Sequence, residues 1–175
     1  MEVSKYDINA LAALRANVTD LIRRAAAAWD AEGVLVYDIA PDEHGGAKEF
    51  FKKSKVVTVG LVGLHKYDIE ADICDAWYLS NLEKADVVVC TEVLEHVFNP
   101  FSAVDGLAAM LKPGGKVVVS TPFNFRIHGP RPDRWRFTED GLRALFHKFD
   151  IRSIHTLESD RFLAPIHYTL IAHKF

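Results

Sequence analysis

Four short runs of apolar, mostly β-branched residues constrain the fold more than any other feature of the sequence. They hold few polar residues, so they lack the alternation of a strand that has one face in water. Strands that are apolar on both sides are typical of parallel sheets, which are covered on both faces. A further short strand is predicted at Ile69. The four runs are residues 34–39, 56–59, 86–91 and 116–121.

Segments with helical signals separate these strands. Asn99 and Thr138 are suitable helix caps, and Pro100 suits a first helical turn. The alternation of apolar strands with helices predicts a doubly wound α/β fold with a mostly parallel sheet. The predicted helices span residues 8–29, 48–54, 99–111 and 138–147.

The end of the sequence predicts two more strands, residues 151–155 and 166–175, joined by a polar loop. Because the connection is short, the two are expected to be antiparallel neighbours. We expect one domain over residues 1–175, with an N-terminal helix within 1–30 and the sheet core over 34–175.

The composition argues against several classes of protein. The chain is 49% hydrophobic with a formal net charge of -3, so no nucleic-acid partner is expected. No stretch approaches the roughly 18 consecutive apolar residues of a membrane span, and no signal peptide is visible. We therefore expect a cytoplasmic protein without a membrane partner. Cys74 and Cys90 lack metal-type spacing, and no metal site is expected.

Polar residues gather where the predicted strands end. In an open α/β sheet, ligands bind beyond the carboxyl ends of the strands. The segments that follow the strands are rich in acids and histidines, while the strands are not, which predicts a ligand site at this edge. These segments are residues 38–46, 60–61, 72–75, 91–97 and 122–128.

A family resemblance rests on the stretch from residue 86 to residue 122. Residues 86–97 read Asp-Val-Val-Val-Cys-Thr-Glu-Val-Leu-Glu-His-Val, followed by Asn-Pro at 99–100, Leu-Lys-Pro-Gly-Gly at 111–115 and another strand. This combination resembles the second half of a class I S-adenosylmethionine-dependent methyltransferase of the type 11 kind. The resemblance implies S-adenosylmethionine as the cofactor. It also implies a seven-stranded sheet whose last strand lies antiparallel between the fifth and the sixth.

The resemblance also implies where the cofactor lies. The loop after the first strand would hold its methionine part, the segment after the third strand would bracket the adenine, and the end of the fourth strand would face the sulfonium and the acceptor. The residues expected to bind the cofactor are, in this order, Asp38, Ala40, Gly45, Gly46, Asp72, Ile73, Thr91 and Glu92.

Two places depart from the family pattern. The family spaces glycines two, four and six residues after an acid, but counting from Asp38 these positions hold Ala40, Asp42 and His44. The family also offers an acid after the second strand for the ribose hydroxyls, where this chain has Gly60.

Because the first loop is crowded, its backbone is expected to take a longer path. We predict that it turns at Pro41 and returns at Gly45 and Gly46. One of these two glycine amides would face the methionine carboxylate near the start of the next helix, where the helix dipole favours anions.

Residues 126–137 resemble the lid or substrate element of these enzymes, and we expect them to cover the acceptor. Arg126, Arg134 and Trp135 are the candidates for binding it, although arginines in a solvated loop and a tryptophan that only buries the lid would give the same pattern. The expected acceptor is a small molecule or a glycan-type compound.

Methyl transfer from a sulfonium is an in-line displacement, for which alignment can supply about 7–11 kcal/mol. A base is needed only where the acceptor must lose a proton. His128 and His96 are then the candidates, because the reference pKa of histidine lies near neutrality. A structural hydrogen bond is an equally good interpretation of either histidine.

Three other functions stay open at this point. A relative that has lost cofactor binding would keep the sheet, and the crowded first loop favours it. A binding module for an anionic ligand would use the lid arginines. A dinucleotide-binding oxidoreductase is disfavoured, because no G-x-G-x-x-G follows the first strand.

Overall fold

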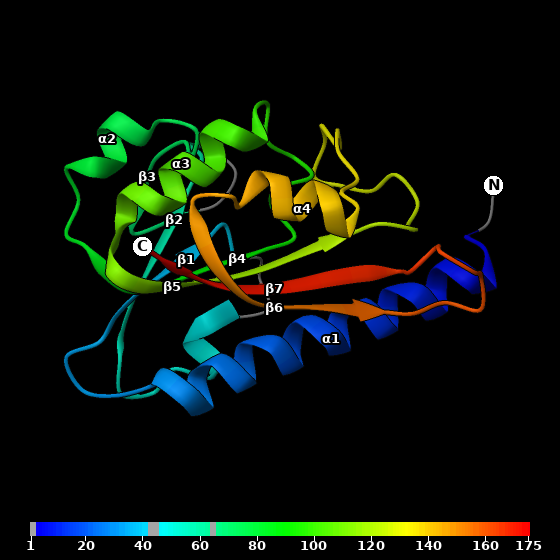
Figure 1. The fold of residues 1–175 in the computed structure, drawn as a ribbon, viewed down its shortest axis with the longest axis horizontal. Helices are drawn as coiled ribbons and strands as arrows, with labels where there is room; N and C mark the ends of the chain where they lie inside the picture. The colour runs from blue at the N-terminus through cyan, green and yellow to red at the C-terminus, as the bar shows by residue number, and fades with distance from the viewer. Residues whose placement is uncertain (1–2, 42–45, 64–65) are drawn as a thin grey trace.

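A computed structural model describes residues 3–41, 46–63 and 66–175. Its centre is a seven-stranded sheet with the order β3-β2-β1-β4-β5-β7-β6, shown in Figure 1. Only β7 runs antiparallel to its neighbours β5 and β6, so the predicted mostly parallel sheet and the inserted last strand are both confirmed. The strands are β1 (Leu35–Ile39), β2 (Lys55–Gly60), β3 (Ile69–Glu70), β4 (Ala85–Thr91), β5 (Leu111–Pro122), β6 (Phe149–Leu157) and β7 (His167–Lys174).

Helices cover both faces of the sheet. Helix α1 (Lys5–Trp29) lies along one face, while α2 (Ala76–Ser80), α3 (Pro100–Met110) and α4 (Glu139–Leu145) lie on the other (Figure 1). The predicted caps Asn99 and Thr138 accept hydrogen bonds from the first backbone amides of α3 and α4. The doubly wound α/β class predicted from the sequence is therefore confirmed.

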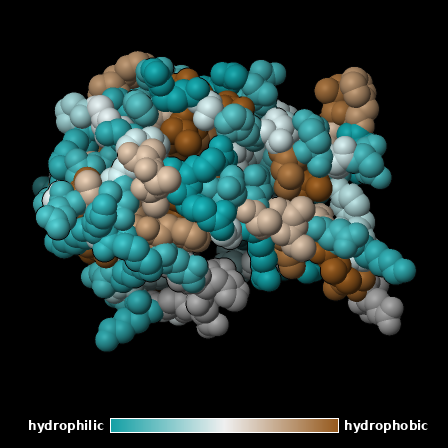
Figure 2. Space-filling model, turned by 90° about the horizontal axis from the view of Figure 1, so that it is seen from below, coloured by the Kyte–Doolittle hydropathy of each residue, from teal (hydrophilic) through white to brown (hydrophobic). Residues whose placement is uncertain are grey.

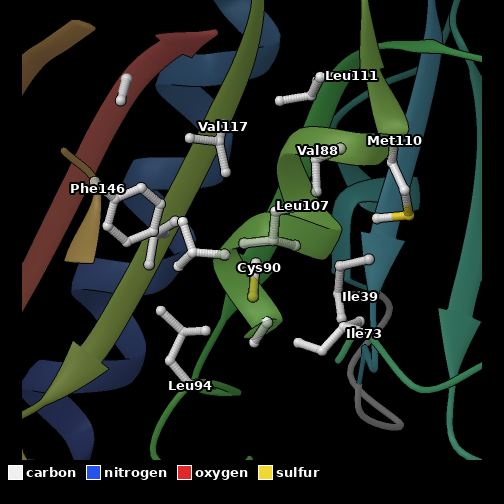
Figure 3. Packing of buried hydrophobic residues seen from close by; sticks show 14 of the residues in the cluster. Ile39, Ile73, Val88, Cys90, Leu94, Leu107, Met110, Leu111, Val117 and Phe146 are labelled. Carbon is white, nitrogen blue, oxygen red and sulfur yellow. The ribbon is translucent and has the colours of Figure 1, made fainter. Parts of the chain in front are cut away.

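The core forms two layers because successive strand residues point to opposite faces. Val36, Val87 and Val118 face α1, where they pack against Leu21 and Ile22. The opposite layer is larger and packs against α3 and α4, as Figure 3 shows for part of it. Members of this layer labelled there include Ile39, Val88, Cys90, Leu107, Val117 and Phe146.

The predicted helix over residues 48–54 is wrong. The structure has instead a 3-10 helix, η1 (Gly46–Glu49), and β2 already begins at Lys55. Residues 52–54 are held by the Asp30 carboxylate, which accepts hydrogen bonds from their backbone amides. The short helix α2 was not predicted, although Asp75 caps it as a helix-starting aspartate would.

The surface on the α1 side is mostly hydrophilic, with hydrophobic residues in scattered patches (Figure 2). Within the described residues, no helix has the length and apolar character needed to cross a membrane.

Candidate functional site

A cavity of about 920 Å³ opens at the carboxyl ends of β1, β2 and β4. Residues of α1 between positions 11 and 22 form one wall, and the lid, residues 126–137, contributes another. The location is the one expected for a ligand in an open α/β sheet. The volume lies at the upper end of the range for small-molecule sites.

The end of β1 is built around Asp38. Its carboxylate is 2% exposed and accepts a hydrogen bond of 2.6 Å from the backbone amide of Ala47, at the start of η1. A Cβ on Gly46 would lie 2.3 Å from Asp38 Oδ2, so only glycine fits there. Both Asp38 and Gly46 line the cavity. Asp42, His44 and Gly45 lie outside the described residues, so the predicted path of the loop stays a prediction.

Ala40 follows β1 directly and has a φ of 46°, in the left-handed region that favours glycine. Its backbone amide donates to the carbonyl of Val59, which holds this turn against β2. The first glycine position of the family pattern is therefore occupied by an alanine in a glycine-like conformation. Ala40 lines the cavity.

The ring of Tyr67 packs against the end of β2, where the family offers an acid. A Cβ on Gly60 would lie 2.3 Å from the Tyr67 ring, so the ring packs directly on the glycine backbone. Both residues line the cavity. The sequence analysis missed Tyr67. The glycine at position 60 is the signal that could have found it, because a glycine at a strand end leaves room for a ring from elsewhere in the chain.

Asp72 and Ile73 lie on the cavity wall after β3. Asp72 is exposed, and its Oδ1 accepts a 2.8 Å hydrogen bond from the amide of Cys74. Ile73 is buried, and a Cβ on Gly106 of α3 would lie 1.9 Å from its carbonyl oxygen. The glycine lets α3 approach closely, which fixes the segment that carries Asp72.

Glu92 lies at the end of β4 beside Thr91, and both line the cavity. It has a positive φ of 56°, an uncommon conformation outside glycine. Its Oε1 accepts from Ser120 Oγ at 2.7 Å and faces His167 Nε2 at 2.6 Å. Asn17 Nδ2 of α1 lies 2.9 Å from His167 Nδ1.

His167 therefore donates to Glu92 through Nε2, because the Asn17 amide nitrogen is itself a donor to Nδ1. This buried chain links α1 to the cavity wall. The sequence analysis missed His167, which lies 75 positions from Glu92, and no local motif marks it.

His96, just after β4, and His128 of the lid are the candidate bases. They come together with ring centroids 5.0 Å apart. Both line the cavity, and Glu95 lies behind them, fully buried. Burial, with the nearby Glu92 charge, raises the pKa of Glu95 to about 7. The facing Glu95 carboxylate raises the pKa of His128, whereas burial lowers that of His96.

The lid is tied to the end of β4. The amides of Arg134 and Trp135 donate to the carbonyl of Glu95, and Trp135 Nε1 donates to the carbonyl of Val97. Trp135 is not among the residues that line the cavity, whereas Arg134 is. The Arg134 guanidinium is engaged with the His96 carbonyl. Arg126 also lines the cavity, with its guanidinium over the Phe125 ring.

Fold and site together define a class I methyltransferase architecture, and solved structures agree. The N-methyltransferase NodS from Bradyrhizobium japonicum WM9 matches with a TM-score of 0.65 and 16% identity, covering 93% of this chain and 96% of that one. A Burkholderia thailandensis 1,6-didemethyltoxoflavin-N1-methyltransferase matches with a TM-score of 0.60 and 17% identity, covering 99% and 92%. At such identities the likeness concerns the fold.

The sequence itself matches the model of a methyltransferase domain family over residues 14–159, and the chain belongs to this family. The Ubiquinone biosynthesis O-methyltransferase of Azoarcus sp. (strain BH72) is 41% identical over 69 residues, which are 36% of this chain and 30% of that protein. The same-named protein of Marinobacter nauticus is 58% identical over 36 residues, 21% of this chain and 15% of that protein. Each match spans less than a third of the relative's own length.

Proposed function

We propose that the chain transfers a methyl group from S-adenosylmethionine to a hydroxyl of a small-molecule or glycan-type acceptor bound under the lid. Family membership supports the class of reaction. The observation that carries the acceptor side is the pair His96 and His128 on the cavity wall. Two imidazoles there suit an acceptor that must lose a proton, as a hydroxyl does.

The residues present fit the cofactor. Asp72 offers an exposed carboxylate on the wall where the adenine amino group would donate, and Ile73 beside it is apolar. Gly46 and Ala47 bring the start of η1 to the methionine end, although the Ala47 amide itself is used by Asp38. Tyr67 and Gly60 would contact the ribose, with an aromatic ring in place of an acid.

S-Adenosylmethionine supplies an electrophilic methyl group when it is bound. The protein's task is then to align the acceptor, exclude water and accept a proton. Glu92, held by His167 and Ser120, would lie beside the reacting groups.

His96 suits the base because its lowered pKa keeps it neutral at pH 7. Its Nδ1 lies 3.0 Å from the carbonyl of Pro132, so Nδ1 carries the proton and Nε2 is the acceptor.

The proposal is tested by incubating the purified chain with S-adenosylmethionine carrying a radiolabelled methyl group and a panel of phenols, alcohols, amines and glycans. Label is expected in a hydroxyl compound. His96→Ala should lower turnover by about 100-fold or more while cofactor affinity stays nearly unchanged. His147→Ala is the matched control, because His147 does not line the cavity and its Nδ1 lies 2.9 Å from the Ala144 carbonyl of its own helix end.

A chain that binds S-adenosylmethionine yet labels none of these compounds would contradict the acceptor proposal and favour a relative without transferase activity. Label confined to amines would contradict the hydroxyl acceptor alone.

A further inference from the structure

Three potential metal ligands converge beneath the lid. Glu95 Oε1 lies 3.7 Å from His96 Nε2 and 3.6 Å from His128 Nε2, and one ligand atom from each of the three residues lies within 4.8 Å of the others. The Glu95 side chain is fully buried, and neither of its carboxylate oxygens has a hydrogen-bond partner among the described residues. A buried carboxylate without a hydrogen bond is costly, and a bound cation would offset that cost.

The tautomers of both histidines can be assigned from their other nitrogen atoms. His96 Nδ1 faces the carbonyl of Pro132 at 3.0 Å, which requires a proton on Nδ1. His128 Nδ1 lies 3.1 Å from Asp133 Oδ2, at ion-pair distance although not in hydrogen-bond geometry. Asp133 is held in turn by Arg136. When both imidazoles are neutral with the proton on Nδ1, both Nε2 lone pairs point toward the Glu95 carboxylate.

In this arrangement two lone pairs and a carboxylate face one point, and a cation bound there would stabilise all three groups. The Nε2–Oε1 distances of 3.6 and 3.7 Å are too long for a shared proton. They are close to the distance of about 3.4 Å that separates two ligands of a tetrahedral zinc ion with bonds of about 2.1 Å.

We propose that Glu95, His96 and His128 bind a divalent transition metal of the zinc type. Two histidines and one glutamate, with a fourth position left open, are the ligand set of catalytic rather than structural zinc sites. The contacts of Nδ1 with the Pro132 carbonyl and the Asp133 carboxylate are those that usually orient metal-binding histidines. Because both imidazoles line the cavity, the open position faces it.

This inference goes beyond the proposed function and does not depend on it. The sequence analysis expected no metal site, because Glu95 and His96 stand 33 and 32 positions before His128 and form no ligand motif. Folding of the lid brings the third ligand in, since the Arg134 and Trp135 amides fasten the lid to the Glu95 carbonyl. A metal here would occupy the Nε2 atoms otherwise available as bases and would instead lower the pKa of a bound hydroxyl.

The test is calorimetric titration of the chelator-treated chain with Zn²⁺, without S-adenosylmethionine. One site per chain is expected, together with a rise in Tm on adding Zn²⁺. Co²⁺ should give the visible absorption of a low-coordinate nitrogen and oxygen site. Glu95→Gln and His128→Ala should each weaken Zn²⁺ binding by more than about 100-fold, and Asp133→Asn by about 10- to 100-fold. His155→Ala, which removes an exposed histidine of β6, should leave it unchanged.

Absence of one-site Zn²⁺ binding in the wild-type chain would overturn the proposal. So would affinity that is unchanged in His128→Ala, because a surface histidine would then be the true ligand. If Glu95→Gln fails to fold, His128→Ala decides alone. Its imidazole is partly exposed and belongs to the lid, so its removal leaves the core around β4 intact. Methyl transfer by a chain that shows no one-site Zn²⁺ binding would leave the proposed function standing while the metal proposal fails.

Discussion

Ala40 and Glu92 both adopt positive φ angles, of 46° and 56°, at the ends of the neighbouring strands β1 and β4. Such conformations cost about 1–3 kcal/mol each and persist only where the surroundings enforce them. Here hydrogen bonds do so, from Ala40 to the Val59 carbonyl and from the Glu92 amide to the Ser120 carbonyl. Both strained residues line the cavity, which is where backbone strain tends to be found.

Gly46→Ala tests whether close packing on Asp38 shapes the first loop. An added Cβ would meet Asp38 Oδ2 at 2.3 Å, and the φ of +50° adds a further cost. We expect a loss of about 2–5 kcal/mol in the free energy of unfolding, measured by denaturant titration, and weaker cofactor binding. Gly114→Ala has a similar φ of +72° but open space around it, so it should lose only about 1–2 kcal/mol. Equal losses in the two variants would argue against the Asp38 contact.

Asp72→Ala tests the adenine side of the cavity. Loss of a hydrogen bond to a charged acceptor is worth about 1.5–3 kcal/mol, which is roughly 10- to 100-fold in affinity for S-adenosylhomocysteine. The Tm of the ligand-free chain should change little, because Asp72 is exposed. Asp75→Ala is the matched control, since Asp75 caps α2 and does not line the cavity. Unchanged affinity in Asp72→Ala would remove this residue from the site.

Among the elements, α3 is placed by a contact that only glycine allows. Gly106 brings the helix against the carbonyl of Ile73, and the other buried residues of α3 pack on the sheet. Asn99 caps the helix and Pro100 begins it, so the start of α3 is set just after the residues 91–97 that border the cavity. The helix thereby connects the core to the wall that carries Asp72.

Gly106→Ala should destabilise the chain although alanine is the better helix former. Its Cβ would meet the Ile73 carbonyl oxygen at 1.9 Å, so the helix or the Ile73 segment must move. We expect a loss of about 2–3 kcal/mol in the free energy of unfolding. Gly141→Ala in α4, whose nearest contact is Thr138 Oγ1 at 3.3 Å, should be nearly neutral. A Gly106→Ala variant as stable as Gly141→Ala would contradict this packing.

The contact between the end of α1 and the residues just before β2 depends on Asp30. Burial acts to raise the pKa of this carboxyl, but hydrogen bonds from Ser54 and from the amides of residues 52–54 lower it to about 2. A pKa lowered on folding stabilises the chain above the unfolded value of about 4, and this stabilisation is lost as the pH falls toward 2. The Tm difference between wild type and Asp30→Asn should therefore be largest at neutral pH and shrink below pH 4.

The control for this pH series is Asp20→Asn, which removes exposed ion pairs with Arg23 and Arg24 and should change Tm little. A Tm difference for Asp30→Asn that is independent of pH would show that the carboxylate charge is not what holds residues 52–54.

At the scale of the whole molecule, the sheet could be predicted because its signals are local. Apolar runs mark the strands, and the short tail connection indicates the antiparallel pair. Helix α2 and η1 span only 5 and 4 residues, too few for a helical period to be visible. Tyr67, Glu95 and His167 were missed because their roles depend on tertiary contacts across the chain, with Gly60, His128 and Glu92 respectively.

The central claim is that the cavity at the carboxyl edge of the sheet binds S-adenosylmethionine. Calorimetric titration of the purified chain with S-adenosylhomocysteine, the product form of the cofactor, tests it most directly. The account predicts saturable binding at one site per chain and a rise in Tm that grows with ligand concentration. Absence of both heat and Tm shift at millimolar ligand would contradict it.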